Sequence, residues 1–229
     1  NRRVVITGLG MVCPVGLNVE ESWNNIINGV SGIASLENID TELQTVKFGG
    51  SVKNFDISSY LNPKDAKKMD IFIHYGVASG IQAIEDSGLE ITNKNAERIG
   101  VAIGAGIGGL QTIEKTTNLF RDKGPRRISP FFVPSSIINM VSGNLSIKYG
   151  LKGPNFAIVT ACTTGTHNIG DASRIIEYGD ADVMIAGGTE MSTTDCGLGG
   201  FAAARALSTR NDDPQTASRP WDIDRDGFV

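Results

Sequence analysis

The chain has 229 residues, of which 40% are hydrophobic and 28 are glycine, a composition typical of a globular protein with a sizeable core. Its 21 basic and 25 acidic residues give a net charge of −4 without a block of like charge, which argues against a nucleic-acid partner. No apolar run approaches the roughly 18 residues of a membrane-spanning helix, and the one near the N-terminus is too short for a signal peptide. Three cysteines do not make a disulfide framework, so we expect a reducing compartment, the cytoplasm.

The N-terminal part of the chain predicts one strand and one helix. Residues 3–7 form a β-branched run that ends in glycine, which predicts a buried strand. Asn18 and Glu21 predict the capping box of a helix that ends at Gly29. The expected apolar stripe of this helix consists of Trp23, Ile26 and Ile27.

The remaining pattern predicts an α/β protein. A long helix is expected over residues 62–87, with Pro63 in its first turn and Gly88 after its end. Its apolar positions recur every three or four residues, at Met69, Ile73, Val77, Ile81 and Ile84. Further strands are expected at residues 99–103, 155–161 and 181–186, and further helices at 110–120, 136–149 and 163–178. Strands that are apolar on both faces and alternate with amphipathic helices predict a layered fold with a mainly parallel sheet. Residues 155–186 would form one βαβ unit.

Cys162 lies where the strand 155–161 meets the helix 163–178. A side chain at a helix N-terminus lies among unpaired N–H groups at the positive end of the helix dipole, where a thiolate is stabilised. The same N–H groups can stabilise an oxyanion on a thioester carbonyl under attack. The arrangement is similar to the nucleophile elbow of serine hydrolases, with sulfur in place of oxygen. A buried structural cysteine is the alternative.

The other cysteines and the two histidines are weaker candidates for catalytic residues. Cys13 and Cys196 lie in glycine-rich segments that open no helix, and no cysteine pair has the spacing of a zinc site, so no metal is expected. His167 follows Cys162 by five residues, about 140° around the same helix, and cannot easily face its sulfur. His74 adjoins an apolar stripe and is expected to be packed or solvated. The acid–base partner of the thiol is therefore not found in this sequence.

The run GAGIGG at residues 104–109 fits the dinucleotide-binding pattern of three glycines after a strand and before a helix. The positions where an acidic residue should follow are basic and turn-like instead. We therefore favour a close-packed strand–helix turn that lines a pocket. A dinucleotide-binding oxidoreductase is the rival interpretation.

Several motifs resemble the β-ketoacyl-[acyl-carrier-protein] synthases. The strongest is VTACTTG at residues 159–165, which resembles their active-site motif. Three further segments are similar to these enzymes: RVVITGLG at 3–10, ISPFFVPS at 128–135 and ARALS at 204–208. GIGGL at residues 106–110 is most similar to the synthase 2 branch, the elongating enzymes of bacterial type II fatty-acid synthesis.

The resemblance implies a thiolase-like fold made of two similar α/β halves. Residues 1–229 match only the first half, the N-terminal domain. The catalytic histidines, the active-site lysine and a glycine-rich loop of the family belong to the second half, and nothing here matches them. The chain is therefore expected to lack the C-terminal half and, by itself, to be an incomplete acyltransferase.

The resemblance also implies a decarboxylative Claisen condensation. Cys162 would take an acyl group from acyl-carrier protein as a thioester. Malonyl-carrier protein would then lose carbon dioxide, and its enolate would attack that thioester to give a 3-oxoacyl product. No cofactor is implied, since the substrates are carried on the phosphopantetheine of the carrier protein. A non-catalytic, chain-length-setting subunit is the second rival, but such subunits typically lack the cysteine.

Further residues take roles by the same resemblance. Ile107 would gate the acyl pocket, Phe132 would reach across a homodimer into the partner's pocket, and Phe201 would line the pocket. The acidic carrier protein would dock on basic residues, for which a solvated surface is the alternative. These are Lys64, Lys67, Lys68, Arg126, Arg127 and Arg205.

Overall fold

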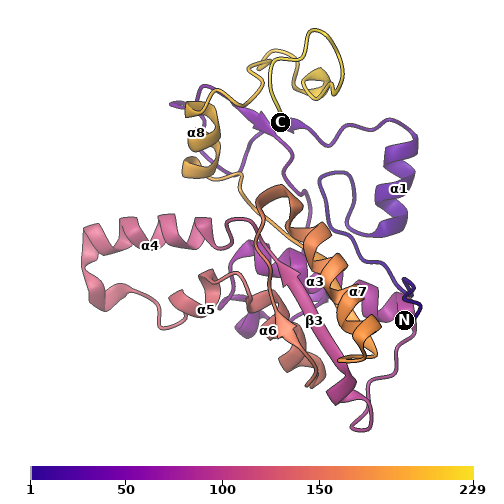
Figure 1. Ribbon diagram of the computed structural model, residues 1–229. Helices are drawn as coiled ribbons and strands as arrows, with labels where there is room; N and C mark the ends of the chain where they lie inside the picture. The colour runs from indigo at the N-terminus through magenta and orange to yellow at the C-terminus, as the bar shows by residue number, and fades with distance from the viewer. Residues whose placement is uncertain (1) are drawn as a thin grey trace. The chain divides into compact units, whose positions relative to one another are not determined.

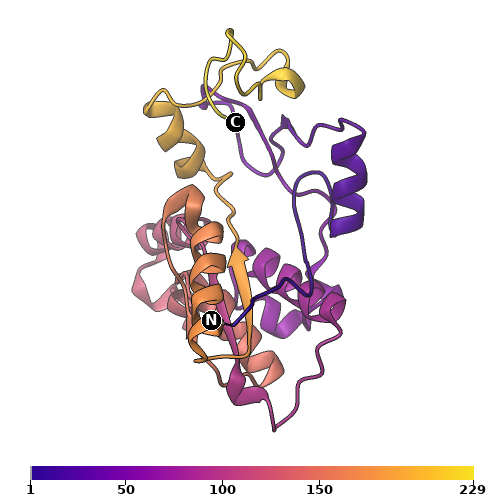
Figure 2. The same cartoon turned by 45° about the vertical axis from the view of Figure 1, so that its right-hand side comes forward.

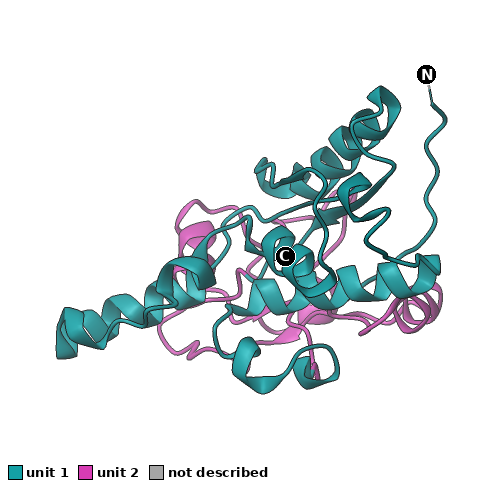
Figure 3. Cartoon of the chain, turned by 90° about the horizontal axis from the view of Figure 1, so that it is seen from below, with its two compact units in different colours: residues 1–11, 56–191 teal, residues 12–55, 192–229 magenta. Residues whose placement is uncertain are grey.

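A computed structural model describes residues 2–229, which form two compact units (Figure 3). The first unit holds the chain up to Met11 and then Asp56–Met191. The second holds Val12–Phe55 and Ser192–Val229. Each unit has its own buried apolar cluster. Within residues 2–229, none of the helices has the length and apolar character that crossing a bilayer would require.

A parallel three-stranded sheet forms the centre of the first unit. β3 (Ile99–Gly104) lies between β4 (Asn155–Phe156) and β5 (Val183–Gly188). β3 and β5 pair in register along all six residues, and β4 pairs with two residues of β3 on its other side. Every residue of β3 is buried, as its uninterrupted apolar and glycine sequence predicts. Because the strands are parallel, their carboxyl ends meet at one edge of the sheet.

Helices cover this sheet. α7 (Thr164–Tyr178) packs on β3 and β5, and α6 (Met140–Tyr149) packs on β3 and on α3 (Ile71–Ser87). Figure 1 shows β3 between α6 and α7, and Figure 2 shows the same packing from another side. Gly76 and Gly80 of α3 permit the close contact with α6, because a methyl group at either would lie within 3 Å of an α6 side chain.

The predicted βαβ unit is present as β4–α7–β5. Its two strands do not pair with each other, since β3 lies between them. β4 ends at Phe156, five residues earlier than expected, because the following backbone is bonded to a side chain of α7 instead of to a strand. The α/β class with a parallel sheet is confirmed.

The expected strand at residues 3–7 was wrong. The segment has no strand structure, and Ile6 is 78% exposed. The chain after it lies against α3, whose side chains accept the N–H groups of Leu9 and Met11. Gly10 permits this approach, because a methyl group there would lie 1.9 Å from a carbonyl oxygen of α3.

The helix expected over residues 62–87 is two helices, α2 (Pro63–Ala66) and α3. The break occurs at Asp70, whose buried carboxylate caps α3 by accepting the N–H of Phe72. The same carboxylate accepts the N–H of Thr112, at 2.8 Å. Asp70 is therefore an N-cap within the apolar repeat, and it separates the predicted helix into two.

The helix expected over residues 136–149 begins four residues later than expected, as α6, because Ile137 is extended after the separate short helix α5 (Phe132–Ser136). α4 (Leu110–Lys123) runs three residues beyond its predicted end. Four short 3-10 helices of the chain are η1 (Ile57–Ser59), η2 (Ala96–Arg98), η3 (Pro125–Arg127) and η5 (Pro214–Thr216).

Besides η5, the second unit is built from two α-helices and one antiparallel strand pair. They are α1 (Val19–Ile27), β1 (Ala34–Ser35), β2 (Phe48–Gly49) and α8 (Asp195–Ala203). Its core consists of Leu36, Val46, Phe48, Leu198 and Ala217.

The predicted start of α1 is confirmed, but the residues expected to form its apolar stripe are exposed. Asn18 caps the helix by accepting the N–H of Glu21, while the Glu21 carboxylate accepts the N–H of Leu17 instead of completing the capping box. The apolar stripe of Trp23, Ile26 and Ile27 is between 51% and 61% exposed. The apolar spacing therefore predicted the helix correctly but did not predict that this face would be exposed.

Candidate functional site

Three segments follow the three parallel strands at the carboxyl edge of the sheet. They are the glycine-rich turn 104–109 after β3, residues 157–163 after β4, and Thr189 with Glu190 after β5. A methyl group on Gly106 would lie 2.8 Å from the Glu190 carboxylate and 3.4 Å from the Ala161 Cα. All three segments therefore meet at Gly106.

Cys162 lies in η4 (Ala161–Thr163), a single 3-10 turn directly before α7, and it is exposed. The preceding Ala161 has a φ of 51°, a left-handed conformation that is uncommon for residues other than glycine. This conformation turns the chain sharply from the sheet into the helix. The predicted placement of the thiol at a helix N-terminus is confirmed, and within residues 2–229 the thiol is not buried.

Asn168 of α7 holds the turn to the end of the sheet. Its side chain is fully buried, donates to the carbonyl groups of Ile158 and Thr164, and accepts the N–H of Ile158. The Thr164 hydroxyl accepts the N–H of Thr160, at 2.9 Å. Cys162 is thus carried on a turn whose two ends are bonded to the first turns of α7.

Both histidines have partners other than the thiol. The Nδ1 of His167 lies 2.8 Å from the Thr160 hydroxyl, and the Nε2 of His74 lies 2.8 Å from the carbonyl oxygen of Ala66. The first contact fixes a ring beside the Cys162 turn, and the second joins α3 to α2. Neither assigns a general base to Cys162.

The Glu190 carboxylate occupies the N–H groups of the glycine-rich turn. It accepts the N–H of Ile107 at 2.7 Å and that of Gly108 at 3.2 Å. A nucleotide phosphate would need such groups free and would be repelled by the carboxylate. The turn is also close-packed, since a methyl group on Gly109 would lie 2.5 Å from the Ser136 Cα. These contacts oppose dinucleotide binding and favour the close-packed turn.

The three residues assigned to an acyl pocket have different surroundings. Ile107 is 41% exposed in the turn beside Ala161. Phe132 is half-buried at the start of α5, whose last residue, Ser136, accepts the N–H of Gly109. Phe201 lies on α8 in the second unit, where its ring meets that of Phe228 edge to face at 5.4 Å.

Five of the six basic residues lie in the first unit. Lys64, Lys67, Arg126 and Arg127 are exposed. Lys68 pairs with Asp65 at 2.9 Å, which lowers the pKa of that carboxyl, and lies 5.3 Å from the centre of the Phe131 ring. The sixth, Arg205, is exposed after α8 in the second unit and has a φ of 54°.

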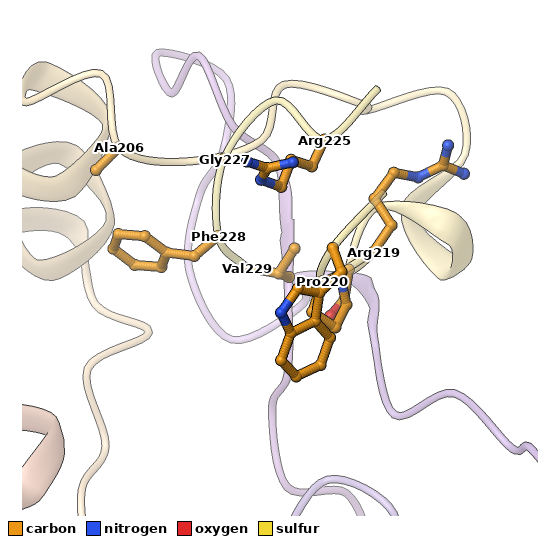
Figure 4. A pocket seen from close by; sticks show the side chains of 9 residues that line it. Ala206, Arg219, Pro220, Arg225, Gly227, Phe228 and Val229 are labelled. Carbon is orange, nitrogen blue, oxygen red and sulfur yellow. The ribbon is translucent and has the colours of Figure 1, made fainter. Parts of the chain in front are cut away.

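A hollow in the second unit holds none of the predicted site residues (Figure 4). It is lined by Ala206, Ser218, Arg219, Pro220, Trp221, Arg225, Gly227, Phe228 and Val229. The three cysteines form no disulfide within residues 2–229. No group of three or more metal-ligating side chains gathers in that part of the chain either.

The sequence profile described as "Beta-ketoacyl synthase, N-terminal domain" matches residues 1–229. The chain belongs to the β-ketoacyl synthase family. It is 62% identical to the 3-oxoacyl-[acyl-carrier-protein] synthase 2 of Vibrio cholerae, 56% to that of Coxiella burnetii and 50% to that of Staphylococcus aureus. Each alignment covers the whole chain but only 55% of the relative, so the chain spans about half the length of these proteins.

Solved structures of the family share the fold. A β-ketoacyl synthase from Burkholderia phymatum matches the whole chain with a TM-score of 0.87 at 25% identity, over 56% of its own length. The ishigamide ketosynthase/chain length factor matches with a TM-score of 0.87 at 24% identity, over 55% of its length. The predicted family and its fold are therefore confirmed.

The role of Asn168 can be tested by replacing it with alanine. We expect Asn168→Ala to lower the free energy of unfolding by about 3 kcal/mol, because it leaves two groups of Ile158 and the Thr164 carbonyl without their partner. Denaturant titration measures this loss. Asn144→Ala is the matched control, since the Asn144 side chain makes one bond, to the Met140 carbonyl within α6, and should cost about 1 kcal/mol. Equal losses in the two variants would contradict the assigned role.

Proposed function

We propose that this chain is the N-terminal half of a 3-oxoacyl-[acyl-carrier-protein] synthase of the synthase 2 type. The observation that carries the proposal is the exposed thiol of Cys162 at the start of α7. The identity of 50–62% to synthases of that name over the full chain supports it. The reaction would be the elongation of a fatty-acyl chain by decarboxylative condensation.

The first half-reaction is the transfer of the acyl group to Cys162. The thiolate attacks the thioester carbonyl of an acyl group carried on phosphopantetheine, and the carbonyl oxygen becomes an oxyanion. Among residues 2–229 the backbone N–H of Cys162 is bonded to no backbone acceptor, so it can donate to that oxyanion. The tetrahedral intermediate then expels the pantetheine thiolate and leaves an acyl thioester on Cys162.

The second half-reaction forms the carbon–carbon bond. Malonyl-carrier protein loses carbon dioxide, and the resulting enolate carbon attacks the Cys162 thioester. The cysteine thiolate leaves, and the 3-oxoacyl product remains on the carrier protein. Donors must meet the negative charge of the enolate, and His74 and His167 are bonded elsewhere. We therefore assign these donors to the second half of the enzyme.

Exposed apolar side chains beside the thiol support the presence of a second half. Val159 and Ile169, on either side of Cys162 in sequence, are 46% and 52% exposed. Large apolar side chains that are exposed in one segment often mark a surface that another domain or a partner covers. The greater length of the relatives is consistent with such a cover.

The partners we propose are an acyl-carrier protein and a second copy of the chain. Lys64, Lys67, Lys68, Arg126, Arg127 and Arg205 are the basic residues assigned to docking of the acidic carrier. Lys68, shortly after α2, lies over the ring of Phe131 in the segment that follows Arg126 and Arg127. Phe132 is assigned to the acyl pocket of the partner copy, and Ile107 and Phe201 to the pocket itself. The cytoplasm, where thiols stay reduced, is the compartment that suits this chemistry.

A non-catalytic role is disfavoured. A subunit that only shapes chain length needs no nucleophile, whereas this chain presents an exposed thiol on a strained turn. An oxidoreductase is disfavoured by the Glu190 carboxylate at the glycine-rich turn.

The proposed nucleophile is tested by Cys162→Ser in the complete enzyme. We expect formation of the 3-oxoacyl product to fall by about three orders of magnitude or more, because a serine hydroxyl is barely ionised near neutral pH. Product is measured by mass spectrometry of the carrier protein after mixing with acyl- and malonyl-carrier protein. Cys196→Ser, at another exposed cysteine, is the control and should keep its activity. Loss of activity in the control with retention in Cys162→Ser would refute the assignment.

The proposed gate is tested by Ile107→Phe. A larger side chain in a fitted apolar site costs typically 1–3 kcal/mol, so long acyl donors should be rejected while short ones still react. Rates of condensation with octanoyl and palmitoyl donors measure the effect. Ile113→Phe on α4, at a side chain of similar exposure, is the control. A uniform loss with both donors would mean that the turn itself was damaged.

A further inference from the structure

Glu190 directs its charge at the backbone of the glycine-rich turn. Its two carboxylate oxygens accept the N–H groups of Ile107 and Gly108, at 2.7 and 3.2 Å. Within residues 2–229 no ion pair is formed by Glu190. Hydrogen bonds to an ionised acceptor are about twice as strong as neutral ones. The carboxylate therefore acts as a two-point clamp on this turn.

The neighbouring residue, Thr189, holds the backbone at Glu190 in place. The backbone N–H of Thr189 donates to the Gly104 carbonyl at 3.0 Å, and the Thr189 hydroxyl donates to the Phe72 carbonyl at 2.8 Å. These bonds anchor the end of β5 to β3 and to α3. Glu190 thus reaches the turn from a rigid part of the sheet.

The glycine-rich turn is held at Gly109, whose N–H donates to the Ser136 carbonyl, and Glu190 holds the two residues before it. Residues 106–109 contain three glycines, and Gly108 has a φ of 80°. Ile107 is the one residue among them that carries a side chain. Holding its N–H group fixes the direction in which its side chain leaves the backbone. Gly106 lies against Ala161, the residue before Cys162, so the position of Ile107 relative to the thiol is set here.

We propose that Glu190 is a positioning residue for acyl-chain selectivity, because its carboxylate holds Ile107 in the place where it obstructs long acyl chains beside Cys162. This inference rests on the proposed function, in which Ile107 gates the acyl pocket. With the clamp removed, the glycine-rich turn can move, and Ile107 obstructs long chains less. Glu190 does not touch the reacting atoms, so the chemistry at Cys162 stays intact for short chains.

The test is Glu190→Ala in the complete enzyme, measured as kcat/KM for octanoyl and palmitoyl donors. We expect the ratio of palmitoyl to octanoyl kcat/KM to rise about threefold to tenfold, within the range of steric discrimination in apolar pockets. Glu190→Gln, which keeps one acceptor oxygen, should give a smaller rise. If Glu190→Ala does not fold, Glu190→Gln is judged by the same ratio. Glu97→Ala, at an exposed carboxylate on η2, is the control and should leave the ratio unchanged.

A double variant separates this inference from the function on which it rests. Ile107→Ala removes the obstruction itself and should raise the ratio. Glu190→Ala should then add nothing in the Ile107→Ala background, since no gate is left to position. A ratio unchanged by Ile107→Ala would refute the gate in the proposed function. Two outcomes would overturn the role of Glu190 alone. In the first, the ratio responds to Ile107→Ala but not to the Glu190 variants. In the second, Glu190→Ala raises the ratio equally in both backgrounds.

Discussion

The parallel pairing of β3 with β4 and β5 determines where the residues of the proposed site are located. Parallel strands bring their carboxyl ends to one edge, and each of the three ends supplies one part of the site. β3 supplies the glycine-rich turn, β4 leads to Cys162, and β5 supplies Glu190. At the opposite edge, Asp182 forms exposed ion pairs with Arg2 and Arg98, which lower the pKa of that carboxyl. At each edge, the residues that meet come from segments far apart in the sequence.

Two polar side chains connect this framework to the thiol. Asn168 bonds the backbone before the Cys162 turn to α7, and Glu190 bonds the glycine-rich turn to the end of β5. Both act on backbone groups that would otherwise lack partners, and leaving such groups unpaired costs about 1–3 kcal/mol each. The position of Cys162, the proposed nucleophile, therefore comes from these neighbours and does not depend on burial of its own side chain.

Much of the fold was predictable because strong local patterns determine it. The apolar runs of β3 and β5 predicted the parallel sheet, and the junction between the expected strand 155–161 and helix 163–178 predicted the place of Cys162. The N-terminal apolar run misled because Gly8 and Gly10 pack on α3, a contact that strand periodicity does not encode. Glu190 was missed for a similar reason, since its partners are backbone N–H groups 82 and 83 residues away, and backbone groups leave no mark in the sequence.

The most direct test of the account is the trapping of the acyl-enzyme. The complete enzyme would be mixed with acyl-carrier protein, without malonyl-carrier protein, and its peptides analysed by mass spectrometry. The account predicts one acyl group per active site, on the peptide that contains Cys162, and its release when malonyl-carrier protein is added. An acyl group on Cys13 or Cys196, or product formation without any acyl group on Cys162, would contradict it.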